Sequence, residues 1–233
     1  YGGSSDDVPH AIISNGDGGY ILAGSTKSIN GDVSSHSGSD SDYWVVNRDS
    51  AGVIKWEKTF GGSGTDVAKD IIKTSDGSYI IAGYSDSDTN TREGPHGNYD
   101  YWIVKISSEG ELEWENSYGG NRADYASSIV QTDDGGYFIS GLSHSYDYHG
   151  NSGNVTSRIQ SSSTLRNSYA GIWLLKLDSN GLIESKQVLD LDTDDTLKIN
   201  ISETAGLVRA DGNDYVISYV RGDYSYVRKV NLA

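Results

Sequence analysis

Asp86, Asp88, Asn90 and Glu93 carry side-chain oxygens at nearly alternating positions of one short segment. Side chains two residues apart in a turning loop converge on one point, which brings several oxygens close to a hard cation such as calcium. Calcium loops usually have glycine at the sixth place, whereas this segment has Thr91. The spacing predicts calcium as a cofactor held by these four residues, with a solvated acidic loop as the alternative.

Two other acidic segments have a looser form of the same pattern. The chain has 33 Asp and Glu residues against 18 Lys and Arg, for a net charge of −15, so acidic loops that only face solvent are expected. The first segment consists of Asn30, Asp32, Asp40 and Asp42, and the second consists of Asp190, Asp192, Asp194 and Asp195. We interpret the second segment as a solvated acidic loop.

Aromatic side chains provide a second kind of candidate site, because the chain has 17 Tyr and 5 Trp but only 2 Phe. A tyrosine has an apolar ring and a polar tip, which suits stacking on a sugar or anchoring a protein partner. Packing of the loops on one another is the alternative. The tyrosines in or beside the long predicted connections, which form the predicted ligand-binding set, are Tyr84, Tyr99, Tyr146, Tyr148 and Tyr169.

The sequence has none of the usual catalytic motifs: no Gly-x-Ser-x-Gly elbow, no phosphate-binding glycine loop and no His-Glu-x-x-His pair. His144 and His149 are a weak transition-metal pattern on a Gly- and Ser-rich segment. Asp7, Asp66 and Asp124 recur in register, and an acid needed once per repeat is expected to close a turn or bind backbone donors. We therefore predict that the protein is not an enzyme.

The repeats that position these residues begin with one motif. Tyr1-Gly2-Gly3 recurs as Phe60-Gly61-Gly62 and Tyr118-Gly119-Gly120, at intervals of 59 and 58 residues. Short runs rich in Val, Ile, Tyr and Trp follow, closed by Asp-Gly, Glu-Gly or Asn-Gly, and such runs form antiparallel hairpins. We predict an all-β, β-propeller-like fold of four repeats of about 58 residues, each a four-stranded antiparallel blade. A β-solenoid is the alternative, but its strands are usually parallel.

The repeats also predict a single domain over residues 1–233, divided at 1–59, 60–117, 118–187 and 188–233. The fourth repeat has residues for only three strands, so the last blade is expected to be incomplete and to expose the edge between Tyr224 and Leu232. An unpaired edge can pair with another chain, which predicts self-association there unless Arg228 and Lys229 blunt it. The long connections of the first three repeats are expected to build the ligand face.

The motif order resembles a known group of repeats. The repeats are similar to those of secreted and surface-exposed, propeller-like proteins of bacteria and archaea. The motifs that carry this resemblance are, in order, Tyr-Gly-Gly, Asp, Asp-Gly-Gly-Tyr-Ile, Ala-Gly and Asp42-Tyr43-Trp44-Val45-Val46. The stretch from Asn30 to Ser34, with His36 and Gly38, is especially similar to them. The resemblance covers nearly the whole chain and weakens after about Asp190. It implies an extracellular or cell-surface location and says little about activity.

Charge and composition restrict the partners. A net charge of −15 without a basic cluster argues against nucleic acid and anionic membranes. The sequence contains no run of 18 apolar residues, so we do not expect it to insert into a membrane. It also contains no Cys, which excludes disulfides and thiolate metal sites. Asn154 and Asn200 begin N-glycosylation patterns.

The function predicted from these observations is a secreted or surface-displayed, non-catalytic binding or adhesion module. Its predicted partner is a glycan or a protein bound by the long loops. One alternative is a polysaccharide-acting enzyme with carboxylates at a channel mouth, because two acids on different repeats would leave no local motif. The other is a structural subunit of an extracellular assembly.

Overall fold

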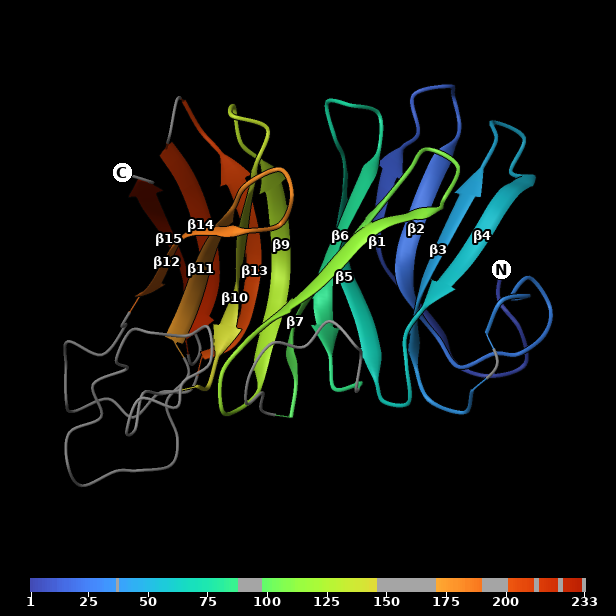
Figure 1. Cartoon of the computed structure of the whole chain (residues 1–233), viewed down its shortest axis with the longest axis horizontal. Helices are drawn as coiled ribbons and strands as arrows, with labels where there is room; N and C mark the ends of the chain where they lie inside the picture. Colours follow the sequence, from blue (N-terminus) through green and yellow to red (C-terminus); the bar gives the residue numbers. More distant parts are fainter. Residues whose placement is uncertain are drawn as a thin grey trace. The chain divides into compact units, whose positions relative to one another are not determined.

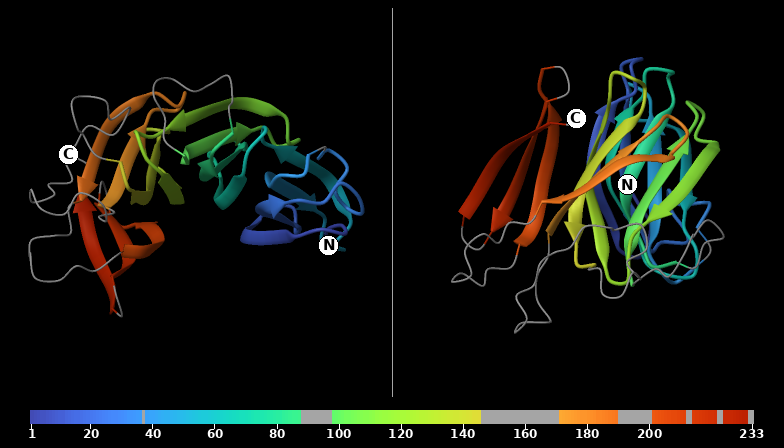
Figure 2. Two further views of the ribbon diagram at one scale, coloured as in Figure 1. Left: turned by 90° about the horizontal axis from the view of Figure 1, so that it is seen from below. Right: turned by 60° about the vertical axis from the view of Figure 1, so that its left-hand side comes forward.

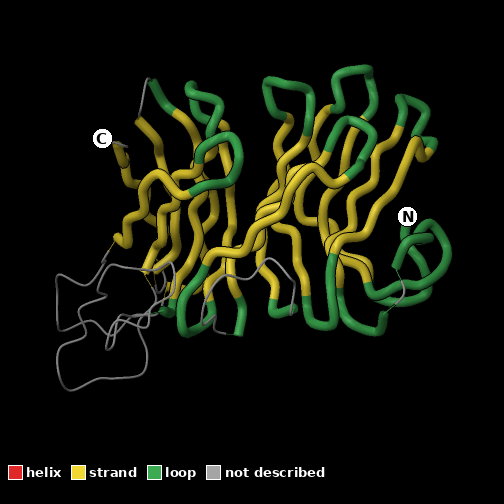
Figure 3. Tube along the Cα trace, in the orientation of Figure 1, coloured by secondary structure: helices red, strands yellow, loops and turns green. Residues whose placement is uncertain are grey.

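The computed structural model describes residues 1–36, 38–87, 98–145, 171–189, 201–211, 214–221 and 224–231. These residues form strands and connections, and no helix occurs among them (Figure 3). The described part of the chain accordingly offers no helix that could span a lipid bilayer.

The strands form four antiparallel sheets that follow one another along the chain (Figure 1). Sheet 1 contains β1 (Asp7–Ser14), β2 (Tyr20–Thr26), β3 (Asp42–Arg48) and β4 (Ile54–Phe60). Sheet 2 contains β5 (Asp66–Lys73), β6 (Tyr79–Ser85), β7 (Asp100–Ile106) and β8 (Leu112–Tyr118). Sheet 3 contains β9 (Asp124–Gln131), β10 (Tyr137–Ser143), β11 (Gly171–Leu177) and β12 (Ile183–Leu189). Sheet 4 has three strands, β13 (Ile201–Arg209), β14 (Asp214–Arg221) and β15 (Tyr224–Asn231), drawn in red in Figure 2.

Tight turns close the hairpins where the sequence predicts them. Gly77 and Gly135 follow an aspartate and have φ angles of 88° and 84°, a backbone conformation that glycine adopts without steric cost. The preceding aspartates accept hydrogen bonds within the turns: Ser78 N donates to Asp76 at 3.0 Å, and Gly136 N donates to Asp134 at 2.9 Å. The all-β prediction of sequential antiparallel blades, with a three-stranded last one, is confirmed, and these antiparallel strands exclude a parallel β-solenoid.

A β-bulge occurs in the first strand of every sheet, at the same register position, between Pro9 and Ala11 in β1 and between Ala68 and Asp70 in β5. The bulge brings a carbonyl of the first strand toward the second strand, so a side chain on Gly83 would collide with the Val67 carbonyl. This close approach explains the glycine of the repeated Ala-Gly pair.

The chain divides into two compact units. Unit 1 comprises Tyr1–Arg92 and Trp102–Ser117, and unit 2 comprises Glu93–Tyr101 and Tyr118–Ala233. Unit 1 thus contains sheet 1 and nearly all of sheet 2, whereas sheets 3 and 4 lie in unit 2. The prediction of a single domain over residues 1–233 stays a prediction.

Each unit has an apolar core between two consecutive sheets. In unit 1, Ile21 and Tyr43 of sheet 1 pack with Ile71 and Trp102 of sheet 2. In unit 2, sheet 3 packs on sheet 4 through a second cluster that contains Phe138, Ile172, Leu174, Tyr215 and Ile217. We call the face that a sheet turns to the next sheet its forward face, and the opposite face its rear face.

A tyrosine hydroxyl joins the sheets at this packing. The buried Tyr43 Oη donates to the Trp102 carbonyl at 2.9 Å, and within unit 2 Tyr101 Oη donates to the Trp173 carbonyl at 3.1 Å. Gly83 leaves room for the first of these hydroxyls, because an added Cβ would lie 2.5 Å from Tyr43 Oη. The repeated tyrosine and the repeated glycine therefore fit one another. Where sheet 3 packs on sheet 4, Ile172 stands in place of the tyrosine and Tyr219 in place of the glycine. Both side chains pack in the apolar cluster of unit 2.

Candidate functional site at the loop ends of the sheets

The connections after β2, β6 and β10 begin at one end of each sheet. The Gly-Gly segment that precedes the first strand of each sheet lies at the same end, and we call it the loop end. One recurring aspartate lies there in each of the first three repeats. Asp66 accepts hydrogen bonds from Gly62 N at 3.0 Å and from Ser87 Oγ at 2.6 Å. Asp124 accepts from Gly120 N and from Ser145 Oγ, both at 2.8 Å.

Asp7 accepts the corresponding bonds from Gly3 N at 2.7 Å and from Ser28 Oγ at 2.9 Å. These bonds tie the Gly-Gly segment to the connection that follows the second strand of the same sheet. The prediction that the recurring acids bind backbone donors is confirmed.

A second aspartate lies close to Asp66, and another lies close to Asp124. Asp42 begins β3, and a Cβ placed on Gly61 would collide with both Asp42 and Asp66, so the glycine passes between two carboxylates. His36 Nε2 lies 3.5 Å from Asp42 Oδ2 and its Nδ1 lies 2.9 Å from the Ser28 carbonyl oxygen. His36 is 6% exposed, so it packs inside the loop.

Burial controls the titration of these acids. Removal from water, with the nearby Asp100 charge adding to it, raises the pKa of Asp124 to about 7 despite its hydrogen bonds from Ser143, Ser145 and Gly120. Burial also raises the pKa of Asp42 to about 6. Asp124 has no exposed surface, and its Oδ1 has no hydrogen-bond partner among the described residues.

Two residues of the first acidic segment bind the first residues of the chain. Asn30 Oδ1 accepts from Ser4 N at 2.9 Å, and Asp32 Oδ2 accepts from Gly2 N at 3.2 Å, so both hold the first residues of the chain against sheet 1. Among the described residues, no group of three or more His, Asp or Glu side chains is placed to hold a metal ion.

The predicted calcium segment is described only at its start. Asp86 directly follows β6, and its Oδ1 accepts a hydrogen bond from Thr65 N in the connection between sheets 1 and 2. Asp88, Asn90 and Glu93 lie outside the described residues, as do Asp190, Asp192, Asp194 and Asp195 of the third segment. Calcium at residues 86–93 therefore stays a prediction.

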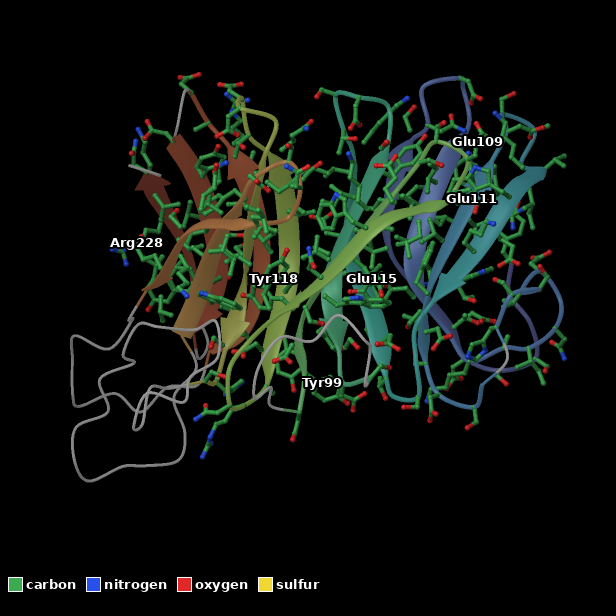
Figure 4. The ribbon with its side chains drawn as sticks, in the orientation of Figure 1. Tyr99, Glu109, Glu111, Glu115, Tyr118 and Arg228 are labelled. Carbon is green, nitrogen blue, oxygen red and sulfur yellow. The ribbon has the colours of Figure 1, made fainter. Side chains whose placement is uncertain are left out.

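Two of the five predicted ligand-binding tyrosines can be placed. Tyr99 lies at the loop end of β7 (Figure 4), and its ring centroid is 5.4 Å from that of Tyr125 in β9. His144, directly after β10, meets Tyr125 edge-on at 6.2 Å between centroids. Tyr84 lies half-buried in β6 and belongs to unit 1. The remaining three, Tyr146, Tyr148 and Tyr169, and the sequons at Asn154 and Asn200 lie outside the described residues.

The grouping of Tyr99, Tyr125 and His144, which we call the aromatic cluster, was not expected from sequence. A backbone hydrogen bond from Asp124 N to the Tyr99 carbonyl, 2.7 Å long, brings the start of β9 beside the start of β7. Tyr125 follows Asp124 directly, so its ring reaches Tyr99. The one available signal was that Tyr125 occupies the place of Val8 and Val67 after the recurring aspartate.

The predicted exposed edge belongs to β15, the outer strand of sheet 4. Val227 is 73% exposed, and Arg228 points away from the ribbon (Figure 4). Lys229 pairs with Asp214 of the neighbouring strand. Pairing of this edge with another chain stays a prediction.

Comparison of the sequence with protein-family models gives no match. Comparison with curated proteins gives no significant match either. The function must therefore be inferred from the site itself.

Proposed function

We propose that the protein is a secreted or surface-displayed, non-catalytic binding module that holds a glycan at the loop end of its sheets. The observation that carries the proposal is the aromatic cluster: two half-buried tyrosine rings whose centroids lie 5.4 Å apart, flanked by an imidazole. A tyrosine ring whose apolar face is partly open stacks on the C–H face of a sugar, while its hydroxyl bonds the sugar hydroxyls. The resemblance to secreted repeat proteins supports the location.

The cluster is held in place before any ligand arrives. The Asp124 N to Tyr99 carbonyl bond fixes the main chain at both tyrosines, and Asp124 itself is tied to the Gly-Gly segment. A preformed site loses little conformational entropy when it binds, so a small aromatic surface suffices for a weak, repeated interaction with a polymer.

The complete burial of Asp124 favours binding over catalysis at that residue. Raised carboxyl pKa values are typical of catalytic acids, and Asp124 and Asp42 both have them. Asp124, however, has no exposed surface and accepts hydrogen bonds from Gly120 N and Ser145 Oγ. A general acid must come within hydrogen-bond reach of its substrate, which this carboxyl does not do. The polysaccharide-acting enzyme is therefore the weaker candidate.

A glycan array tests the proposal. The wild-type protein should bind one or a few related glycans, and Tyr99→Ala and Tyr125→Ala should each weaken that binding at least tenfold. Tyr99→Phe and Tyr125→Phe are the matched controls, because they keep the ring that stacks and remove only the hydroxyl. A protein that binds no glycan, or alanine variants that bind as the wild type does while remaining folded, would contradict the proposal.

A further inference from the structure

Apolar side chains remain exposed on the first and the last sheet, at register positions that are buried or partly buried in the middle of the chain. On the rear face of sheet 1, Ile12 is 62% exposed and pairs across the strands with Leu22. On the forward face of sheet 4, Val208 and Val227 are 64% and 73% exposed.

The repeats show what covers these positions elsewhere. Ile12 and Leu22 correspond in register to Ile71 and Ile81 of sheet 2, which are 1% and 0% exposed because the forward face of sheet 1 packs on them. A rear face of this type is therefore built to receive the forward face of another sheet.

The forward face of sheet 4 has a matching precedent. Val208 and Val216 pair with each other as Val130 and Phe138 do in sheet 3. Val130 and Phe138 pack on the rear face of sheet 4, in the core of unit 2. The forward face of sheet 4 thus keeps apolar residues at positions that make a sheet-to-sheet contact one repeat earlier.

We propose that a second copy of this chain covers these surfaces, with the forward face of sheet 4 in one copy packed on the rear face of sheet 1 in the other. The contact continues the packing already present within each unit, between surfaces of the same two types. Because the two surfaces differ, the association is head-to-tail, so it builds rings or open chains and not only isologous pairs.

Two features make this contact weaker than the packing of sheet 1 on sheet 2. Ser225 stands at the register position of Tyr43, so no tyrosine hydroxyl reaches across from sheet 4. Part of the rear face of sheet 1 is already covered, since Val33 packs on Trp44 and Val46. Association should therefore depend on concentration.

The experiment uses sedimentation velocity over a hundredfold range of protein concentration. Ile12→Asp removes one surface and Val208→Asp the other, and Val208 lies on β13, away from the β15 edge. The matched controls are Val53→Asp and Leu182→Asp, which add the same charge to turn residues that are 62% and 66% exposed. Circular dichroism checks that all four variants remain folded.

The wild type and both controls should show larger species that increase with concentration, and each face variant alone should remain monomeric. A mixture of Ile12→Asp with Val208→Asp should form dimers and nothing larger, because each variant keeps one intact surface that fits the other. The proposal is overturned if the wild type is monomeric throughout, as it would be if its own two faces met. It is also overturned if either face variant still associates alone, which would implicate the β15 edge, or if the mixture remains monomeric.

Discussion

The recurring aspartates accept the same set of hydrogen bonds in three repeats, yet their surroundings differ. Burial would raise the pKa of Asp7, but hydrogen bonds from Thr26, Gly3 and Ser28 lower it below its usual value. Asp124 lies deeper, beside Asp100, and its pKa is raised to about 7. The same structural role therefore has opposite consequences for stability as the pH changes.

Asp124 should make the protein less stable as the pH rises. Its folded-state pKa of about 7 lies above its ordinary value of 3.8, so between these values the folded protein binds more protons than the unfolded chain. The stability from this group is fully present below about pH 4 and is lost as the pH rises through 7. Urea unfolding at pH 5 and pH 8 measures the effect. The decrease in unfolding free energy should be smaller in Asp124→Asn, and an equal decrease in both proteins would contradict the pKa shift.

At the scale of elements, the hairpins and their order could be predicted because each depends on neighbouring residues. Alternating apolar runs and the Asp-Gly turns at Gly77 and Gly135 act within a few residues of one another. The aromatic cluster could not be predicted in this way, because it requires the start of β7 and the start of β9 to meet. Contacts between residues distant in sequence leave no periodic pattern.

The tyrosine that joins consecutive sheets provides a test at this scale. Tyr43→Phe keeps the ring in the core and leaves the buried Trp102 carbonyl without its 2.9 Å hydrogen bond. A buried hydrogen bond contributes about 0.5–1.5 kcal/mol to stability, so the unfolding free energy should fall by that amount. Tyr226→Phe, at a ring that is 39% exposed, should change it by less than about 0.5 kcal/mol. Equal effects in the two variants would show that the Tyr43 hydroxyl does not join the sheets.

The connection after β6 carries the calcium prediction. If Asp86, Asp88, Asn90 and Glu93 hold calcium, a chelator should lower the melting temperature, because an ion bound only by the folded state stabilises it by mass action. Asp88→Ala should abolish most of this sensitivity, whereas Asp40→Ala, in the first acidic segment, should keep it. A melting curve that is identical with and without chelator would leave only a solvated acidic loop.

For the whole molecule, charge and repetition point to the same kind of function. A net charge of −15 disfavours anionic partners, and the repeats build several sheets whose second strands end at the loop end. The acids that repeat are committed to holding these connections, while the aromatic side chains between them remain partly open. These features support the proposal that the protein binds its ligand without altering it.

The most direct measurement follows a polysaccharide that contains the glycan selected by the array. Its chain length is determined by light scattering before and after prolonged incubation with the protein, and complex formation is measured in the same samples. We expect a complex that Tyr99→Ala weakens and a chain length that does not change. Progressive shortening of the polymer, lost in Asp42→Asn or Asp124→Asn, would show that the buried acids are catalytic and would contradict the binding-module account.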